Sequence, residues 1–179
     1  MLTTQSNPVP IAHIALLINL ATVPANLKLI CQNNQLKYLC KRAVKTSDIT
    51  LLKLLRIISL HDEMKKEFLG YIDDMLTIIT KDSCSEMIVE CLGILGNIGL
   101  LDNFDFLKSI NNYEILPFLL STLQQKSSAE TTGLDKNDDL LLEVIVLIGT
   151  MLNDSKAIPK ILETGIPKLI VNLLLCNSS

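Results

Sequence analysis

The sequence predicts an all-α solenoid of repeated helical units, and three observations support this fold class. Of the 179 residues, 49% are hydrophobic and only 4% are aromatic, so the chain can bury a large and mainly aliphatic core. Apolar residues recur at helical spacing through most of the chain. Four strongly apolar segments also recur along the chain, and three of them carry a polar residue at the aligned position.

These four segments define the repeat. They cover residues 17–21, 56–60, 95–99 and 148–152, and they align on Asn19, Ile57, Asn97 and Thr150 at intervals of 38, 40 and 53 residues. A period near forty is typical of armadillo and HEAT arrays, in which each unit is two or three helices. We therefore expect an armadillo-repeat, right-handed solenoid of about four three-helix units. Such an array presents a long surface, so the pattern favours binding as the function.

Each unit is expected to open with an apolar helix, which two shorter helices follow. The expected helices cover residues 10–21, 24–30, 36–44, 48–60, 64–69, 72–80, 86–98, 104–110, 116–125, 139–152, 156–163 and 167–176. Asp48 is a suitable N-cap for the opening helix of the second unit. Gly165 and Pro167 mark the end of one helix and the start of the next. The opening helices are apolar almost all round, so neighbouring units must cover them.

The expected domain organisation is one armadillo domain over residues 10–176, which follows a disordered tail at 1–9. The stretch 126–138, KSSAETTGLDKND, is polar and breaks the period, so we predict an exposed, flexible insertion there. Exposed loops accept extra length at little cost, which favours a tolerated insertion. A regulatory or partner-binding role is the alternative.

Composition indicates the cellular environment of the protein. The five cysteines are odd in number and none forms a C-x-x-C pair, which favours a reduced, intracellular environment. The apolar runs contain charges or are shorter than the roughly 20 residues that a membrane-spanning helix needs, so they read as core helices. The first ten residues are polar and carry no secretory-signal pattern.

The sequence offers no recognisable catalytic constellation. It contains no Gly-rich phosphate loop, His-x-x-x-His pair or nucleophile elbow, and His13 and His61 fall in different units. The triplet at 61–63 could imitate part of a metal or acid–base site, but we interpret it as a solvated helix end with Asp62 as an N-cap. No enzymatic activity, metal or cofactor is expected.

Asparagine at the aligned position is a candidate contact for a partner. In armadillo arrays this helix lines the concave groove, and the donor and acceptor of Asn19 and Asn97 would suit the main chain of an extended peptide. A bond of the asparagine to its own helix or to water is the alternative. The residues four places before the aligned position include Lys53, and the chain has no Trp. A receptor for basic nuclear-import peptides is therefore not favoured.

Charge is distributed unevenly, which suggests a docking surface. Residues 1–66 hold nine Lys/Arg against three Asp/Glu, whereas residues 67–179 hold seven against sixteen. An acidic partner segment could dock on the basic residues of the helical stretch 36–56, although a solvated helix face is the simpler interpretation. These basic residues are Lys37, Lys41, Arg42, Lys45, Lys53 and Arg56. Nucleic acid is disfavoured by the net charge of −3 and the scarcity of aromatic residues. The candidate partner-binding residues are Asn19, Lys53, Arg56 and Asn97, with a weaker, adjacent basic patch at Lys37, Lys41 and Arg42.

Particular side chains resemble one known family. The matching positions are 26–31, 36–37, 41–43, 59, 61–62, 88–93, 113, 116–117, 142–144 and 148–150. Together they resemble the kinesin-associated protein, the non-motor subunit of heterotrimeric kinesin-II, over about residues 10–176. The resemblance implies a non-catalytic armadillo adaptor that binds the tails of two kinesin motor chains and links them to cargo, ciliary cargo included. It implies a cytoplasmic location on the cytoskeleton, with cilia as one such place.

The chain departs from this family at three points. Ile57 stands where the family pattern favours Asn, and the stretch 126–138 is longer than the family norm. The family's subunit is also much larger, so we expect a fragment of a longer array or a truncated paralogue, with apolar end faces exposed. The alternative functions are a general armadillo scaffold and a regulator of a small GTPase.

Overall fold

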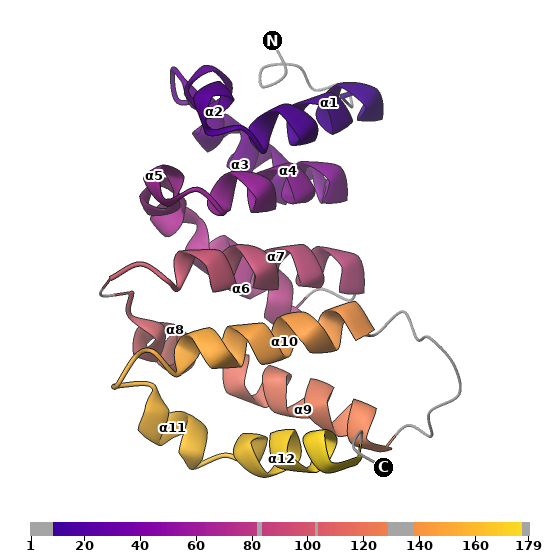
Figure 1. Ribbon diagram of the computed structural model, residues 1–179, viewed down its shortest axis with the longest axis vertical. Coiled ribbons are helices and arrows are strands. Elements are labelled where there is room, and N and C mark those ends of the chain that lie inside the picture. Colours follow the sequence, from indigo (N-terminus) through magenta and orange to yellow (C-terminus); the bar gives the residue numbers. More distant parts are fainter. Residues whose placement is uncertain (1–8, 82–83, 103, 129–137, 177–179) are drawn as a thin grey trace.

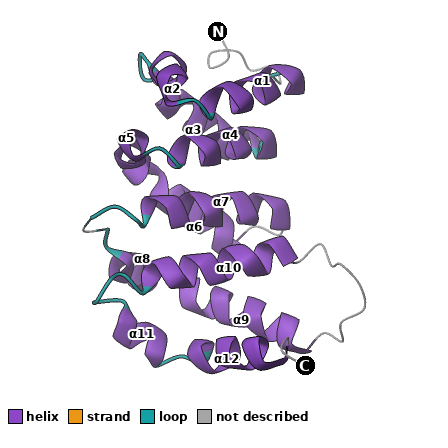
Figure 2. Cartoon of the chain, in the orientation of Figure 1, coloured by secondary structure: helices purple, strands orange, loops and turns teal. Residues whose placement is uncertain are grey.

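A computed structural model describes residues 9–81, 84–102, 104–128 and 138–176. Every regular element in these ranges is a helix, which confirms the predicted all-α class (Figures 1 and 2). The elements are α1 (Ile11–Ala21), α2 (Pro24–Cys31), α3 (Gln35–Thr46), α4 (Ile49–Ser59), α5 (Asp62–Lys65), the 3-10 helix η1 (Lys66–Tyr71), α6 (Ile72–Lys81), α7 (Ser85–Ile98), α8 (Phe106–Asn112), α9 (Ile115–Ser128), α10 (Asp138–Met151), α11 (Ile158–Leu162) and α12 (Ile166–Cys176).

The four apolar opening helices form one continuous layer. Helix α1 packs on α4, α4 on α7, and α7 on α10, so the layer runs from the N-terminal to the C-terminal end of the molecule (Figure 1). Helices α3, α6 and α9 lie behind this layer and pack on α4, α7 and α10 respectively. The armadillo assignment and its right-handed sense remain predictions.

The core is aliphatic, and it is densest in the middle of the front layer. Helix α4 buries Leu51, Leu52, Leu54, Leu55 and Ile58 almost completely, because α1, α3 and α7 surround it. Full burial of each such side chain stabilises the fold by about 1.5–3 kcal/mol. Helix α7 is buried on nearly every side between α4, α6 and α10. Packing against neighbouring helices therefore covers the apolar surfaces of α4 and α7.

Side chains fix several helix starts. The carboxylate of Asp48 accepts hydrogen bonds from the backbone N–H groups of Thr50 (3.0 Å) and Leu51 (3.1 Å), which confirms the predicted N-cap. Asp105 caps α8 in the same way, by accepting from the N–H of Lys108 at 3.0 Å. Each bond satisfies an amide that the first helical turn leaves without an intrahelical acceptor.

Some predicted boundaries were wrong. Helix α9 continues to Ser128 and α10 begins at Asp138, so both ends of the predicted insertion 126–138 are helical. Residues 129–137 of that insertion and residues 1–8 of the predicted tail lie outside the described residues. The expected helix at 64–69 is divided between α5 and the tighter turns of η1, a common form of short connection.

The interpretation of His61 as part of a solvated helix end was also wrong. His61 itself occupies the N-cap position of α5, and Asp62 is the first helical residue. The His61 ring is partly buried, and its Nε2 lies 2.9 Å from the carbonyl oxygen of Ala21. The last carbonyl groups of a helix lack intrahelical donors. His61 therefore ties the start of α5 to the end of α1.

Among the described helices, none combines the length and apolar character required to cross a bilayer.

Candidate partner-binding face

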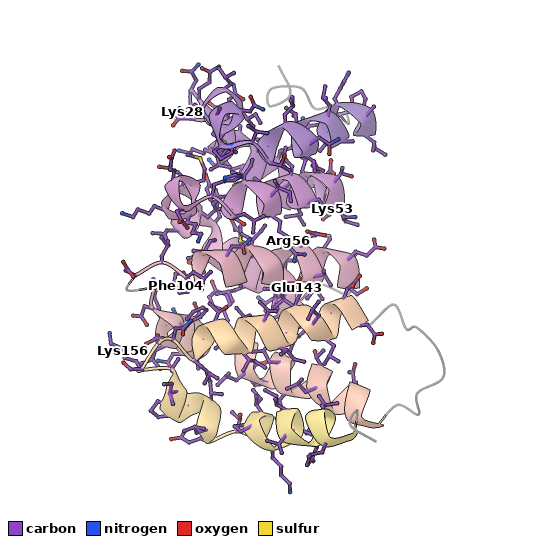
Figure 3. The ribbon with its side chains drawn as sticks, viewed as in Figure 1. Lys28, Lys53, Arg56, Phe104, Glu143 and Lys156 are labelled. Carbon is purple, nitrogen blue, oxygen red and sulfur yellow. The ribbon has the colours of Figure 1, made fainter. Side chains whose placement is uncertain are left out.

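The outer side of α4, α7 and α10 brings together several charged and polar residues, which we call the front face. Lys53 and Arg56 come from α4, Glu90 and Asn97 from α7, and Glu143 from α10. They meet because these three helices are consecutive members of the front layer. Figure 3 shows Lys53, Arg56 and Glu143 on this side of the molecule.

Arg56 connects all three helices of the front face. Its Nη2 forms a hydrogen-bonded ion pair with Oε1 of Glu143, and its Nη1 lies 3.7 Å from Oε2 of Glu90. To reach α10, the Arg56 side chain crosses the backbone of α7 at Gly93. A Cβ atom added to Gly93 would lie 2.6 Å from Cζ of Arg56. The absence of a side chain at Gly93 therefore makes room for the crossing.

The two carboxylates would be costly to bury without Arg56. Glu90 and Glu143 are both buried, each with 8% of its surface exposed. Burial raises the pKa of Glu90, while the nearby charges of Arg56 and Lys53 partly oppose that rise. The positive charge of Arg56 is thus directed inward at two acidic groups. In the free protein, Arg56 therefore links α4 to α7 and α10.

Asn97 also binds within the protein. Its Nδ2 donates to Oγ of Ser59 at 2.9 Å, and Ser59 in turn donates to the carbonyl oxygen of Arg56 at 2.7 Å. This chain of bonds joins α7 to the last turn of α4. The amide nitrogen of Asn97 therefore has a partner on a different helix, whereas the alternative interpretation had placed its bond on its own helix or on water. A role of Asn97 in peptide binding remains a prediction.

Two other predicted residues are open to solvent. Lys53 is exposed and precedes Arg56 by one helical turn on α4. Asn19 is exposed on α1, which packs on α4 in the front layer. Within the described residues, neither side chain forms a hydrogen bond or ion pair that a partner would have to break.

The second basic patch does not join the front face. Lys37 and Lys41 are exposed and Arg42 is partly buried, and all three lie on α3. Helix α3 lies behind the front layer in Figure 1. The structure therefore separates this patch from Lys53 and Arg56, which the sequence analysis had treated as adjacent to it.

Sequence analysis missed Gly93, Glu90 and Glu143 as members of the front face. One signal was available, because Glu90 and Glu143 are 53 residues apart, the same interval that separates Asn97 from Thr150. The two glutamates thus occupy equivalent places in successive units. Their common partner, Arg56, could not be identified from this spacing.

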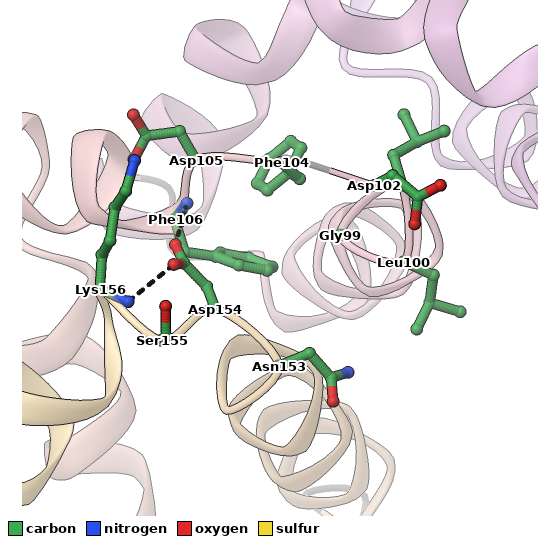
Figure 4. Close-up of a pocket in the computed structure, with 11 residues that line it drawn as sticks. Gly99, Leu100, Asp102, Phe104, Asp105, Phe106, Asn153, Asp154, Ser155 and Lys156 are labelled. Atoms are coloured by element: carbon green, nitrogen blue, oxygen red, sulfur yellow. Dashed lines mark hydrogen bonds between the residues drawn. The ribbon is translucent and has the colours of Figure 1, made fainter.

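A cleft also lies at one edge of the stack, between the α7–α8 connection and the α10–α11 turn (Figure 4). Its volume is about 530 Å³. The carboxylate of Asp154 accepts from the backbone N–H of Phe106 at 3.1 Å and of Lys156 at 2.9 Å. Two of its three aspartates, Asp105 and Asp154, therefore act as helix and turn caps. In the described parts of the chain, no three His, Cys, Asp or Glu side chains form a group that could hold a metal.

Comparison with known proteins gives one family. The family model described as "Kinesin-associated protein (KAP)" matches residues 1–178 of the chain. No solved structure matches this chain.

Proposed function

Because the chain belongs to the kinesin-associated protein family, we propose that it is a non-catalytic adaptor of a kinesin motor. In this role it binds the tails of kinesin-II motor chains and links them to cargo. The family match over residues 1–178 is the observation that carries the proposal. The layered helices support it, since a layered array offers a long surface for a partner.

The front face is the proposed contact with the motor tail. Lys53 is its exposed cation and would meet an acidic side chain of the tail, while Asn19 extends the contact surface to α1. Arg56 has a different role from the one that the sequence suggested, because Glu90 and Glu143 already match its charge. It stabilises the surface on which the tail lies. Lys37, Lys41 and Arg42 would serve a separate contact.

The proposal includes a location and a set of partners. We expect the protein in the cytoplasm on the cytoskeleton, cilia included, because its motor partners move along microtubules. Its partners would be motor chains and cargo proteins. Nucleic acids, small-molecule substrates and membrane insertion have no part in this role.

A binding measurement with a charge-reversed variant tests the proposal. The 179-residue protein is immobilised, and purified tail segments of kinesin-II motor chains are titrated over it. Lys53→Glu should weaken binding by about tenfold, which corresponds to about 1.4 kcal/mol, because a favourable contact becomes a repulsive one. Lys28→Glu and Lys156→Glu are matched controls, since both lysines are exposed and lie away from the front face (Figure 3).

The outcomes separate the surface from the function. If Lys53→Glu binds as well as the wild type, the front face is not the contact. If the wild-type protein binds no motor tail, the adaptor proposal fails. Affinity purification that recovers a small GTPase and no motor chain would instead favour the scaffold or GTPase-regulator alternative.

A further inference from the structure

Helix α3 carries a row of basic side chains on one face. Lys37, Lys41 and Lys45 follow one another at intervals of four residues, and all three are exposed. Side chains four residues apart lie on the same face of a helix. With a rise of about 1.5 Å per residue, these lysines stand about 6 Å apart along the helix axis, and the row is about 12 Å long. We call this narrow cationic row the α3 strip.

The charges of the α3 strip have no partner within the protein. Helix α3 contains no Asp or Glu. In the described parts of the chain, none of the three lysines forms an ion pair or a hydrogen bond through its ammonium group. Arg56 differs in this respect, because two carboxylates already match its charge. The strip is therefore free to pair with charges on another molecule.

The same row faces solvent on an interior helix of the stack. Helices α3 and α6 share the spacing of three buried apolar residues, which are Leu39, Cys40 and Ala43 in α3 and Met75, Leu76 and Ile79 in α6. On this alignment, Lys37 corresponds to Asp73 and Lys45 corresponds to Lys81. Asp73 and Lys81 are exposed, although α6 lies between α3 and α9 at the back of the molecule (Figure 1). The strip thus belongs to the outer side of the back helices.

A protein segment with repeated carboxylates matches the strip in both charge and spacing. In an extended chain, the side chains on one side recur every two residues, about 6.6 Å apart. This distance is close to the spacing of the lysines, so Asp or Glu at every second position can pair with all three of them at once. A single exposed ion pair is weak. Three pairs in register are therefore what makes such a contact specific.

The neighbouring helix limits the partner to a narrow chain. Asp73 and Asp74 are exposed on α6, and η1, which packs on α3, leads directly into α6. An anionic membrane or a nucleic-acid duplex is broader than one helix, so its phosphates would approach these carboxylates and be repelled. An extended peptide can lie along α3 without that approach.

From this match, we propose that the α3 strip binds an extended acidic segment of a partner protein. Carboxylates at alternate positions of the segment pair with the three lysines. Tyr38, which is 48% exposed, and the partly buried Arg42 border the strip and contact the side of the segment. The strip lies behind the front layer, so one molecule can hold this segment and a partner of the front face together. The proposal does not depend on the adaptor role.

Fluorescence anisotropy with a labelled peptide tests the proposal. The probe is a short peptide in which glutamate and serine alternate, and the same peptide with glutamine in place of glutamate is the uncharged control. The wild-type protein should bind the first peptide only, and less tightly as ionic strength rises. Lys41→Glu should weaken binding about tenfold, because it places a negative charge at the centre of the strip. Circular dichroism checks that this variant folds, which its favourable spacing from Lys37 and Lys45 supports.

Lys81→Glu is the matched control, because Lys81 takes the place of Lys45 on α6. Lys45→Glu should weaken binding severalfold, whereas Lys81→Glu should stay within about twofold of the wild type. Equal losses in these two variants would reduce the effect to overall charge and overturn the assignment to the strip. A wild-type protein that does not bind the glutamate peptide at low ionic strength would overturn the proposal altogether.

Two further probes separate a peptide from other anionic partners. Phosphatidylserine vesicles and duplex DNA should bind the wild-type protein less tightly than the glutamate peptide does. Tighter binding of either probe, lost in Lys41→Glu, would assign the strip to that class of partner and overturn the assignment to a peptide.

Discussion

The side chain of Arg56 lies across the α carbon of Gly93, and this crossing lets one arginine of α4 reach a glutamate of α10. Helix α7 stands between the two helices, and a side chain at position 93 would occupy the path of the guanidinium. The crossing adds ion pairs to the apolar contacts among α4, α7 and α10. Several consequences of this arrangement can be measured.

Gly93→Ala should be less favourable than the same change at Gly149. Both glycines are inside helices, where alanine is better than glycine by about 1 kcal/mol. At Gly149 the new methyl group meets open space, so Gly149→Ala should raise the free energy of unfolding by about 0.5–1 kcal/mol. At Gly93 the methyl group displaces Arg56 from its two carboxylates, which should cost about 1–3 kcal/mol and cancel that gain. Urea denaturation measures both variants.

A double-mutant cycle shows whether Arg56 causes the difference. In an Arg56→Ala background, Gly93→Ala has no guanidinium to displace and should stabilise the protein as Gly149→Ala does. If Gly93→Ala already stabilises the wild-type protein by the same amount, Arg56 moves aside freely and its ion pairs contribute no net stability.

Asn97 and Asn19 should differ in their effect on stability, although they are equivalent in the sequence repeat. Asn97→Ala removes the hydrogen bond to Ser59 and should lower the free energy of unfolding by about 1 kcal/mol. Asn19 is exposed, and Asn19→Ala should change it by no more than about 0.5 kcal/mol. Thermal or chemical denaturation of the two variants makes the comparison. Equal effects would contradict a structural role for Asn97.

Glu90 should make stability depend on pH. Burial raises its pKa above the ordinary value of 4.5, so the folded protein holds this proton more tightly than the unfolded chain. The associated stability is fully present below the ordinary pKa and is lost as pH rises through the raised pKa. Glu90→Gln stays neutral and avoids that loss. Its stability relative to wild type should therefore improve as pH rises above 4.5.

Denaturation curves at several pH values measure this difference. Glu86→Gln, an exposed position on the same helix, controls for the general effect of one fewer negative charge. A difference between Glu90→Gln and wild type that does not change with pH would show that Arg56 fully compensates the burial of Glu90.

The Cys40 thiol should resist alkylation in the folded protein. Burial, with a smaller contribution from Cys31, raises the pKa of Cys40 to about 12. At pH 8 only about one molecule in ten thousand then carries the reactive thiolate. Iodoacetamide should label Cys40 only after unfolding in urea, as followed by mass spectrometry of its peptide. Equal labelling rates in folded and unfolded protein would contradict the burial of this side chain.

Local features of the fold were predictable from the sequence. The Asp48 cap depends on residues two and three places along the chain, and the opening helices follow from unbroken apolar periodicity. Boundaries were less certain where several competing signals meet. The polar segment from 126 reads as a loop, yet helix α9 extends to Ser128, because serine and lysine in a last helical turn do not by themselves end a helix.

The front face was only partly predictable. Lys53 and Asn19 were expected at a surface, and they are exposed. The pairing of Arg56 with Glu143 joins residues 87 positions apart, and no local pattern reports a contact at that separation. The sequence showed a repeated asparagine, but it could not show that the side-chain amide of Asn97 would donate to the hydroxyl of Ser59. Such contacts between distant residues depend on how the helices pack against one another.

The carboxylate of Asp154 gives the edge of the stack a property of its own. It accepts from the amide of Phe106, the first residue of α8, although the two residues are 48 positions apart in the chain. Exchange of the Phe106 amide hydrogen with solvent deuterium therefore requires its hydrogen bond to Asp154, in the α10–α11 turn, to open. The exchange rate of this one amide in α8 thus reports how often α8 and the α10–α11 turn separate.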